Sequence, residues 1–125
     1  MCQNGADIII GTHPHVVQPT GKHISENGNE AYVFYSLGNF ISNQGEIEKI
    51  LGGMADVTLV KENDKVRIEK YQMHPTVTHV SDGKYSVYML ADYTDELAKK
   101  HTRCPGLTVE KLKKLYNDIR GIKVY

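Results

Sequence analysis

His13 and His15 are the residues of this chain whose types and spacing point most directly to chemistry. The proline between them has a fixed φ and biases the preceding residue toward an extended conformation. Side chains two positions apart in an extended segment point to the same side, so we expect the two imidazoles to project together. Neutral imidazole is a ready metal ligand, and two on one side can chelate one ion or each hold one ion of a pair. The spacing therefore predicts a metal site; the alternative is a rigid surface turn whose histidines cap nearby backbone.

A strand over residues 7–11 has to position this pair. Its continuous β-branched run is typical of a strand buried on both faces in the sheet of an α/β protein. Ligand sites in open α/β sheets lie beyond the carboxyl ends of the strands, which is where His13 and His15 fall. Residues 3–5 resemble the end of a helix, because Gly5 is the residue type preferred just past a helix end. We therefore expect the chain to begin inside a helix–strand unit and to be part of a longer protein.

A second candidate group follows the aromatic, strand-like residues 31–36. Gly38 permits a tight turn there, so the Asn39 amide is presented at the tip of the strand. Asn39 can ligate a metal or bind a substrate oxygen, and Gln44 adds a polar group with the same options. The alternative for Asn39 is an asparagine that merely occupies a left-handed turn. We predict Asn39 and Gln44 as substrate-binding residues.

The sequence gives less reason to assign the other histidines to a metal site. His74 and His79 can complete a site if the fold brings them near the first pair, or they can satisfy local hydrogen bonds. His23 and His101 are expected at the surface. A catalytic metal pair normally also needs carboxylates, and no Asp or Glu is placed as an obvious bridging ligand. The chain has no Gly-x-Ser-x-Gly elbow, phosphate-binding P-loop or Gly-x-Gly-x-x-Gly fingerprint.

The remaining patterns predict an α/β fold in which strands of a mixed sheet precede two helices. Further strands are expected over residues 22–25, 54–61, 65–73, 76–80 and 85–90. Helices are predicted over residues 93–101 and from the N-cap Thr108 to Gly121. We assign residues 1–90 to the β-rich part of a domain and residues 91–125 to the helical segment of the same domain.

Composition excludes some partners. Fifteen basic residues balance fifteen acidic ones, which gives no electrostatic reason to expect nucleic acid as a partner. The longest apolar run, at residues 8–10, is too short for a membrane span, and no signal peptide or anchor is expected in this chain. Cys2 and Cys104 lie at opposite ends and are expected as free thiols.

Two motifs together resemble a known family. Residues 5–19 (GADIIIGTHPHVVQP) and residues 33–41 (VFYSLGNFI), followed by Gln44, resemble the bacterial capsule synthesis proteins of the CapA type. These proteins belong to the calcineurin-like metallophosphatase superfamily and are associated with poly-γ-glutamate capsules. The resemblance is most specific over residues 4–44. Thr12 stands where many of these proteins carry an additional histidine.

The resemblance implies the C-terminal part of a four-layer α/β/β/α sandwich with a metal site at the strand tips. It implies that His13 and His15 bind divalent metal ions (Mn, Zn, Fe or Mg), while the other ligand motifs precede this region. It further implies capsule biosynthesis or export through a phosphoesterase-like site, and a cell-envelope or extracellular location for the full-length protein. We expect this fragment to be inactive alone.

Two alternatives to this interpretation remain. The chain can be a non-enzymatic module that binds polymer or assembles the capsule machinery. It can also be a structural half that associates with itself or with a missing N-terminal half.

Overall fold

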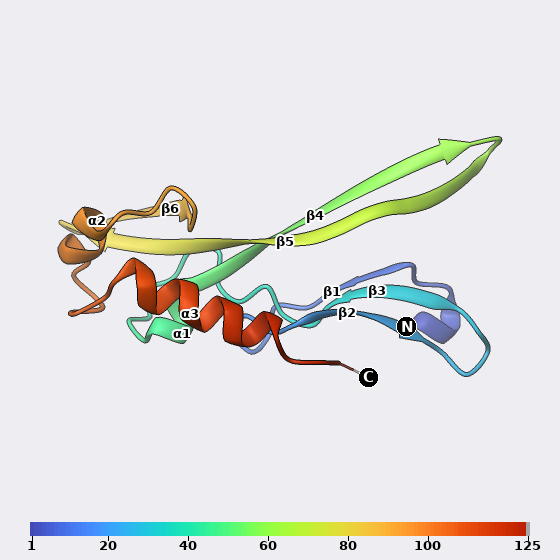
Figure 1. Cartoon of the computed structure of the whole chain (residues 1–125), viewed down its shortest axis with the longest axis horizontal. Coiled ribbons are helices and arrows are strands. Elements are labelled where there is room, and N and C mark those ends of the chain that lie inside the picture. Colours follow the sequence, from blue (N-terminus) through green and yellow to red (C-terminus); the bar gives the residue numbers. More distant parts are fainter. Residues whose placement is uncertain (125) are drawn as a thin grey trace.

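The computed structural model describes residues 1–124 as an elongated molecule built on two three-stranded sheets (Figure 1). Tyr125, the last residue of the predicted helical segment, lies outside the described residues. The elements in chain order are η1 (Cys2–Asn4), β1 (Ile8–Ile10), β2 (Thr20–Ile24), β3 (Glu30–Phe34), α1 (Ile47–Ile50), β4 (Leu51–Glu62), β5 (Lys65–Ser81), β6 (Lys84–Met89), α2 (Asp95–Lys100) and α3 (Val109–Arg120). None of the described helices is long and apolar enough to cross a membrane.

The first sheet has the order β1-β3-β2 and is mixed, as predicted. β1 runs parallel to β3, whereas β2 and β3 form an antiparallel hairpin. The short helical turn η1 ends at Gly5, whose φ of 87° is left-handed, in agreement with the helix end expected there. This sheet carries the loop with the histidine pair at the end of β1.

The second sheet has the order β4-β5-β6 and contains a long hairpin whose tip projects away from the helices (Figure 1). The β4–β5 turn consists of Asn63 and Asp64, both with positive φ (49° and 61°), and the β5–β6 turn of Asp82 and Gly83 (52° and 72°). Two left-handed residues match the twist of the flanking strands, so these short polar turns set the register of both hairpins. Both turns fall in the gaps between predicted strands, after residue 61 and after residue 80.

β5 is a single strand, whereas we predicted a break at Pro75 between two strands. Pro75 pairs with Gly53 of β4, and its carbonyl accepts a hydrogen bond from the Leu90 amide at 2.9 Å. The N and O of one strand residue point to the same side, so the missing N–H of Pro75 faces the region beyond Met89, where β6 has ended. Proline is tolerated there because no ladder donor is required.

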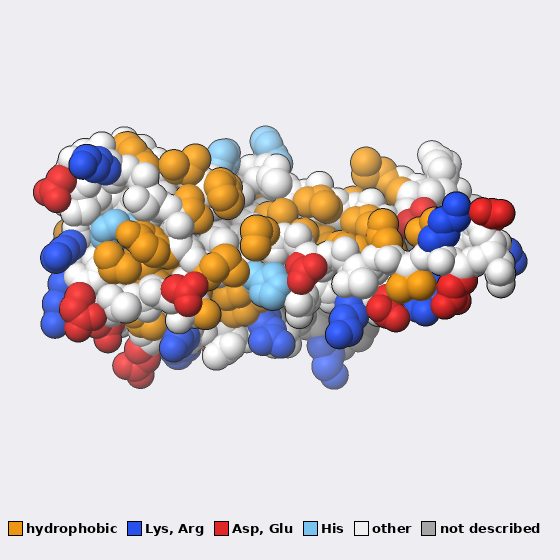
Figure 2. Space-filling view, turned by 90° about the horizontal axis from the view of Figure 1, so that it is seen from above, with side chains coloured by type: hydrophobic (Ala, Val, Ile, Leu, Met, Phe, Trp, Pro, Cys, Tyr) orange, Lys and Arg blue, Asp and Glu red, His pale blue; other side chains and the backbone are white. Residues whose placement is uncertain are grey.

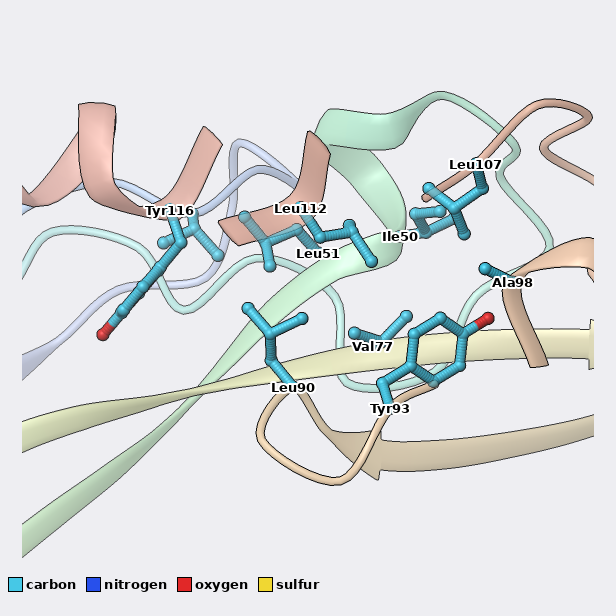
Figure 3. Close-up of a cluster of buried hydrophobic side chains, with 10 residues drawn as sticks. Ile50, Leu51, Val77, Leu90, Tyr93, Ala98, Leu107, Leu112 and Tyr116 are labelled. Atoms are coloured by element: carbon cyan, nitrogen blue, oxygen red, sulfur yellow. The ribbon is translucent and has the colours of Figure 1, made fainter. Parts of the chain in front are cut away.

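Two helices complete the fold, as predicted, and a threonine caps the N-terminus of each. The Thr94 hydroxyl accepts from the Leu97 amide at the start of α2, and the Thr108 hydroxyl accepts from the Lys111 amide at the start of α3. The apolar face of α3 buries Leu112 and Tyr116 against β4 and β5 (Figure 3). The largest core cluster lies between this helix and the second sheet: Val17, Ile50, Leu51, Val77, Leu90, Tyr93, Ala98, Leu107, Leu112 and Tyr116.

The first sheet is less covered than predicted. We expected β1 to be buried on both faces, but it is an edge strand, and Ile10 is 53% exposed. On one face of the molecule, apolar side chains spread over the middle, while charged ones lie toward the two ends and along one long edge (Figure 2). The described residues thus form an α/β arrangement of mixed strands followed by helices. The four-layer sandwich stays a prediction.

Candidate metal centre

Gly11 sets the course of the loop that carries the histidines. Its amide donates to the Phe34 carbonyl and its carbonyl accepts from the Leu37 amide, each at 2.8 Å. A Cβ at this position would collide with the carbonyl oxygen of Tyr35. Only glycine therefore lets the end of β1 pass so close to the chain leaving β3, which brings the segment after β1 beside the segment after β3.

The His13-Pro14-His15 segment is a turn rather than an extended stretch. The His15 amide donates to the Thr12 carbonyl at 3.4 Å, and His15 has a left-handed φ of 61°. The prediction of extended geometry was therefore wrong, since the local hydrogen bond closes the turn despite the preference of a residue before proline. Both His13 and His15 are exposed to solvent, so the turn presents both imidazoles at the surface.

Asn39 lies buried beneath this turn and is hydrogen-bonded to it. Its Oδ1 lies 2.7 Å from His15 Nδ1, and its Nδ2 donates to the His15 carbonyl at 3.3 Å. The same Nδ2 lies 2.8 Å from Gln44 Oε1 and 3.0 Å from the carbonyl of Lys49. The structure thus brings together three of the four predicted site residues. Both polar atoms of the Asn39 amide are already engaged within the protein.

The segment around Asn39 is itself tied to both sheets. Gly38 has a left-handed φ of 65°, and its amide donates to the Ser36 hydroxyl at 3.1 Å. The Gly53 amide of β4 donates to the Leu37 carbonyl at 2.7 Å. The site is therefore built where the end of the first sheet meets the start of the second.

His74 and His79 lie apart from this turn. His74 Nε2 is 3.0 Å from Asp56 Oδ2, which also accepts from Gln72 at 2.9 Å. These two contacts lower the pKa of the Asp56 carboxyl. Asp56 pairs with Gln72 across the β4–β5 ladder, so the register of this hairpin, had it been worked out, was the signal for this group. It is a surface cluster of the hairpin, and sequence reasoning did not identify it.

The other two histidines differ from each other. His23 is exposed, as expected. His101 was expected at the surface but is only 3% exposed, and that prediction was wrong. Its Nε2 is 3.0 Å from the Thr78 carbonyl, and its Nδ1 accepts from the amides of Arg103 and Cys104. The ring therefore caps the chain after α2, a structural role for which the helix-end sequence carried no signal.

His79 belongs to the same buried region as His101. Its Nδ1 lies 2.8 Å from the Tyr93 hydroxyl, and the two histidine rings lie edge to face at 5.3 Å. Burial, with a smaller contribution from His101, lowers the pKa of His79. The structural interpretation of His79 fits this placement. Cys2 and Cys104 are free thiols, as predicted.

The donor set of the turn is incomplete for a catalytic metal pair. Within residues 1–124, no group of three or more His, Cys, Asp or Glu side chains is placed to hold a metal ion. Two exposed imidazoles suit a divalent transition metal by donor type, but carboxylate or further imidazole ligands are needed to close its coordination. The residues of this chain thus fit part of a metal site.

The described residues form a mixed sheet followed by helices, with an exposed histidine turn at the end of the parallel strand β1, which places the chain in the α/β class. Comparison with known proteins narrows this class. Residues 1–44 match the family model described as bacterial capsule synthesis protein PGA_cap. This N-terminal part of the chain is therefore similar to bacterial capsule synthesis proteins.

Two curated relatives each match 45 residues of the chain. The PGA biosynthesis protein CapA of Bacillus subtilis (strain 168) is 51% identical over 45 residues, which are 36% of this chain and 10% of the relative. The capsule biosynthesis protein CapA of Bacillus anthracis is 47% identical over 45 residues, with the same coverage. The chain therefore matches about a tenth of the length of these relatives. No solved structure matches the chain.

Proposed function

We propose that this chain contributes to capsule biosynthesis or export, with poly-γ-glutamate as the polymer, and carries part of a metal-dependent phosphoesterase-like site. The names of the two CapA relatives and the family match over residues 1–44 support the capsule role. The exposed turn that bears His13 and His15 lies inside the matched segment. That coincidence is the observation that carries the metal part of the proposal.

In this proposal His13 and His15 hold a divalent cation: Mn, Zn, Fe or Mg. The cation, when bound, supplies a Lewis acid that activates water toward a phosphoryl centre. This chain's own contribution is to present two imidazoles on a turn anchored by Gly11 and Asn39. The chain alone does not hydrolyse phosphodiesters, because its described residues supply too few ligands.

Metal binding by the purified chain tests the ligand assignment. We expect Zn²⁺ or Mn²⁺ binding, measured by calorimetry, to be lost in the double variant His13→Ala/His15→Ala. The matched control is His23→Ala, which removes an exposed histidine of β2 outside the turn. Equal binding by the double variant and the wild type would reject His13 and His15 as ligands and would favour a non-enzymatic polymer-binding or assembly module.

An activity assay tests the second part of the proposal. The pure 125-residue chain, supplied with Mn²⁺ or Zn²⁺, is expected to leave a generic phosphodiester such as bis(4-nitrophenyl) phosphate intact. Metal-dependent turnover that disappears in the double variant would show that the site is complete within this chain, contrary to the proposal.

A further inference from the structure

We infer that Asn39 is a positioning residue that fixes the tautomer of His15, so that His15 offers Nε2 and not Nδ1 as its ligating nitrogen. The inference deepens the proposed function, on which its metal-binding part rests. The tautomer itself is a property of the metal-free chain and can be tested without any metal.

The orientation of the Asn39 amide follows from its neighbours. Nδ2 lies 3.3 Å from the His15 carbonyl and 3.0 Å from the Lys49 carbonyl. Backbone carbonyls only accept hydrogen bonds, so the atom facing them has to be the NH₂ donor. The other amide atom, which faces the His15 ring, is therefore the oxygen.

An amide oxygen facing His15 determines where the ring proton lies. Asn39 Oδ1 is 2.7 Å from His15 Nδ1 and can only accept, so Nδ1 of the neutral ring has to carry the proton. Nε2 then keeps its lone pair, and the imidazole is exposed to solvent. A ring nitrogen with a free lone pair and an accessible direction is the form in which histidine binds a metal.

The same side chain also stabilises the backbone of His15. A left-handed φ is uncommon for a residue other than glycine, and His15 adopts one at 61°. Asn39 contacts both the ring and the carbonyl of His15, so one buried amide holds the imidazole and the main chain together. Asn39 is only 9% exposed, and its bond to Lys49 links it to the chain just before β4. The buried Asn39 amide therefore holds the turn in one position relative to the start of β4.

Hydrogen bonding of the second ring nitrogen is a general feature of metal-ligating histidines. It fixes the orientation of the ring, and loss of such a partner typically costs 10–100-fold in metal affinity. We therefore expect Asn39→Ala to weaken Zn²⁺ binding by roughly 10–100-fold, although Asn39 does not touch the metal.

The test is a long-range ¹H–¹⁵N correlation spectrum of the ¹⁵N-histidine-labelled chain at pH 8, without metal. Wild-type His15 is expected to show a protonated Nδ1 and an unprotonated Nε2. Asn39→Ala removes the acceptor and should release His15 into a mixture of tautomers. Asn39→Asp keeps an acceptor oxygen but loses the donor to the two carbonyls, so it should preserve the Nδ1–H form.

The two variants separate positioning from general support of the loop. A purely structural Asn39 would make both variants behave alike, because both lose the bonds to His15 and Lys49 carbonyls. A wild-type His15 protonated on Nε2, or an Asn39→Ala variant with an unchanged tautomer, would overturn the inference. If Asn39→Ala fails to fold, the wild-type spectrum and Asn39→Asp still decide it.

Zn²⁺ titration of the same samples distinguishes failure of the inference from failure of the proposed function. A change in the His15 Nε2 signal on addition of Zn²⁺ supports both the inference and the proposed function. A fixed tautomer with no Zn²⁺ effect on His13 or His15 supports the positioning role of Asn39 and rejects the metal assignment.

Discussion

Replacing Gly11 by alanine is expected to destabilise the chain by about 2–4 kcal/mol. Gly11 has no left-handed φ, so the penalty comes from space and not from backbone conformation. The new methyl group would collide with the Tyr35 carbonyl, a backbone atom that cannot rotate away. Inserting one carbon into a filled site costs roughly 1–3 kcal/mol. Loss of one flanking hydrogen bond, to Phe34 or from Leu37, adds about 1 kcal/mol.

Urea unfolding of the 125-residue chain, followed by far-UV circular dichroism, measures this cost. Gly121→Ala is the matched control, because Gly121 has an ordinary φ of −72° and a Cβ there meets its nearest atoms at 3.5 Å. The control should change the free energy of unfolding by about 1 kcal/mol or less, with stabilisation expected. Equal effects of the two substitutions would refute the argument that the end of β1 requires glycine for its close approach to β3.

Two further predictions concern buried residues of α3 and β5. Leu112→Ala removes a fully buried side chain of α3 and should lower the free energy of unfolding, measured with urea, by about 2–5 kcal/mol. Lys113→Ala, at the exposed neighbouring position, should change it by no more than about 0.5 kcal/mol. Similar losses in the two variants would mean that α3 does not cover the sheet. The second prediction concerns pH: burial, with a smaller contribution from His101, lowers the pKa of His79 below its ordinary value of 6.5. The folded state therefore binds fewer protons than the unfolded state, and stability that is present above pH 6.5 is lost as the pH falls through and below that value. His79→Phe should flatten that part of the stability–pH curve, and an unchanged slope would assign it to other groups.

Local signals in the sequence predicted the elements well where short-range geometry decides the structure. The polar turns at Asn63 and Asp82 gave two hairpins because consecutive left-handed residues favour that connection. Thr108 was predicted as an N-cap, and its hydroxyl makes the expected bond. These interactions span only a few residues, so one sequence contains all the information they need.

Tertiary surroundings decided the features that were missed. Pro75 was expected to end a strand. However, β6 ends at Met89, which pairs with Thr76, so no residue of β6 lies opposite Pro75 and its missing N–H breaks no hydrogen bond of the ladder. His101 was expected at the surface, but the Thr78 carbonyl and two amides bond its ring inside the fold. The position of Pro75 just beyond the end of β6 and the contact of His101 with Thr78 both depend on residues more than ten positions away, which no local pattern specifies.

In the histidine turn, too, local sequence predicted some features, while tertiary contacts determined others. Residue types alone pointed to His13 and His15, because two imidazoles around a proline are suited to metal binding. Their geometry was predicted as extended from Pro14, yet the bond to Thr12 and the contacts from Asn39 produce a left-handed His15. Asn39 itself was predicted to face substrate, but its amide is engaged by protein on both atoms. In the proposed site the motif supplies the two candidate ligands, and the neighbouring strand end, through Asn39, leaves Nε2 of His15 free to bind.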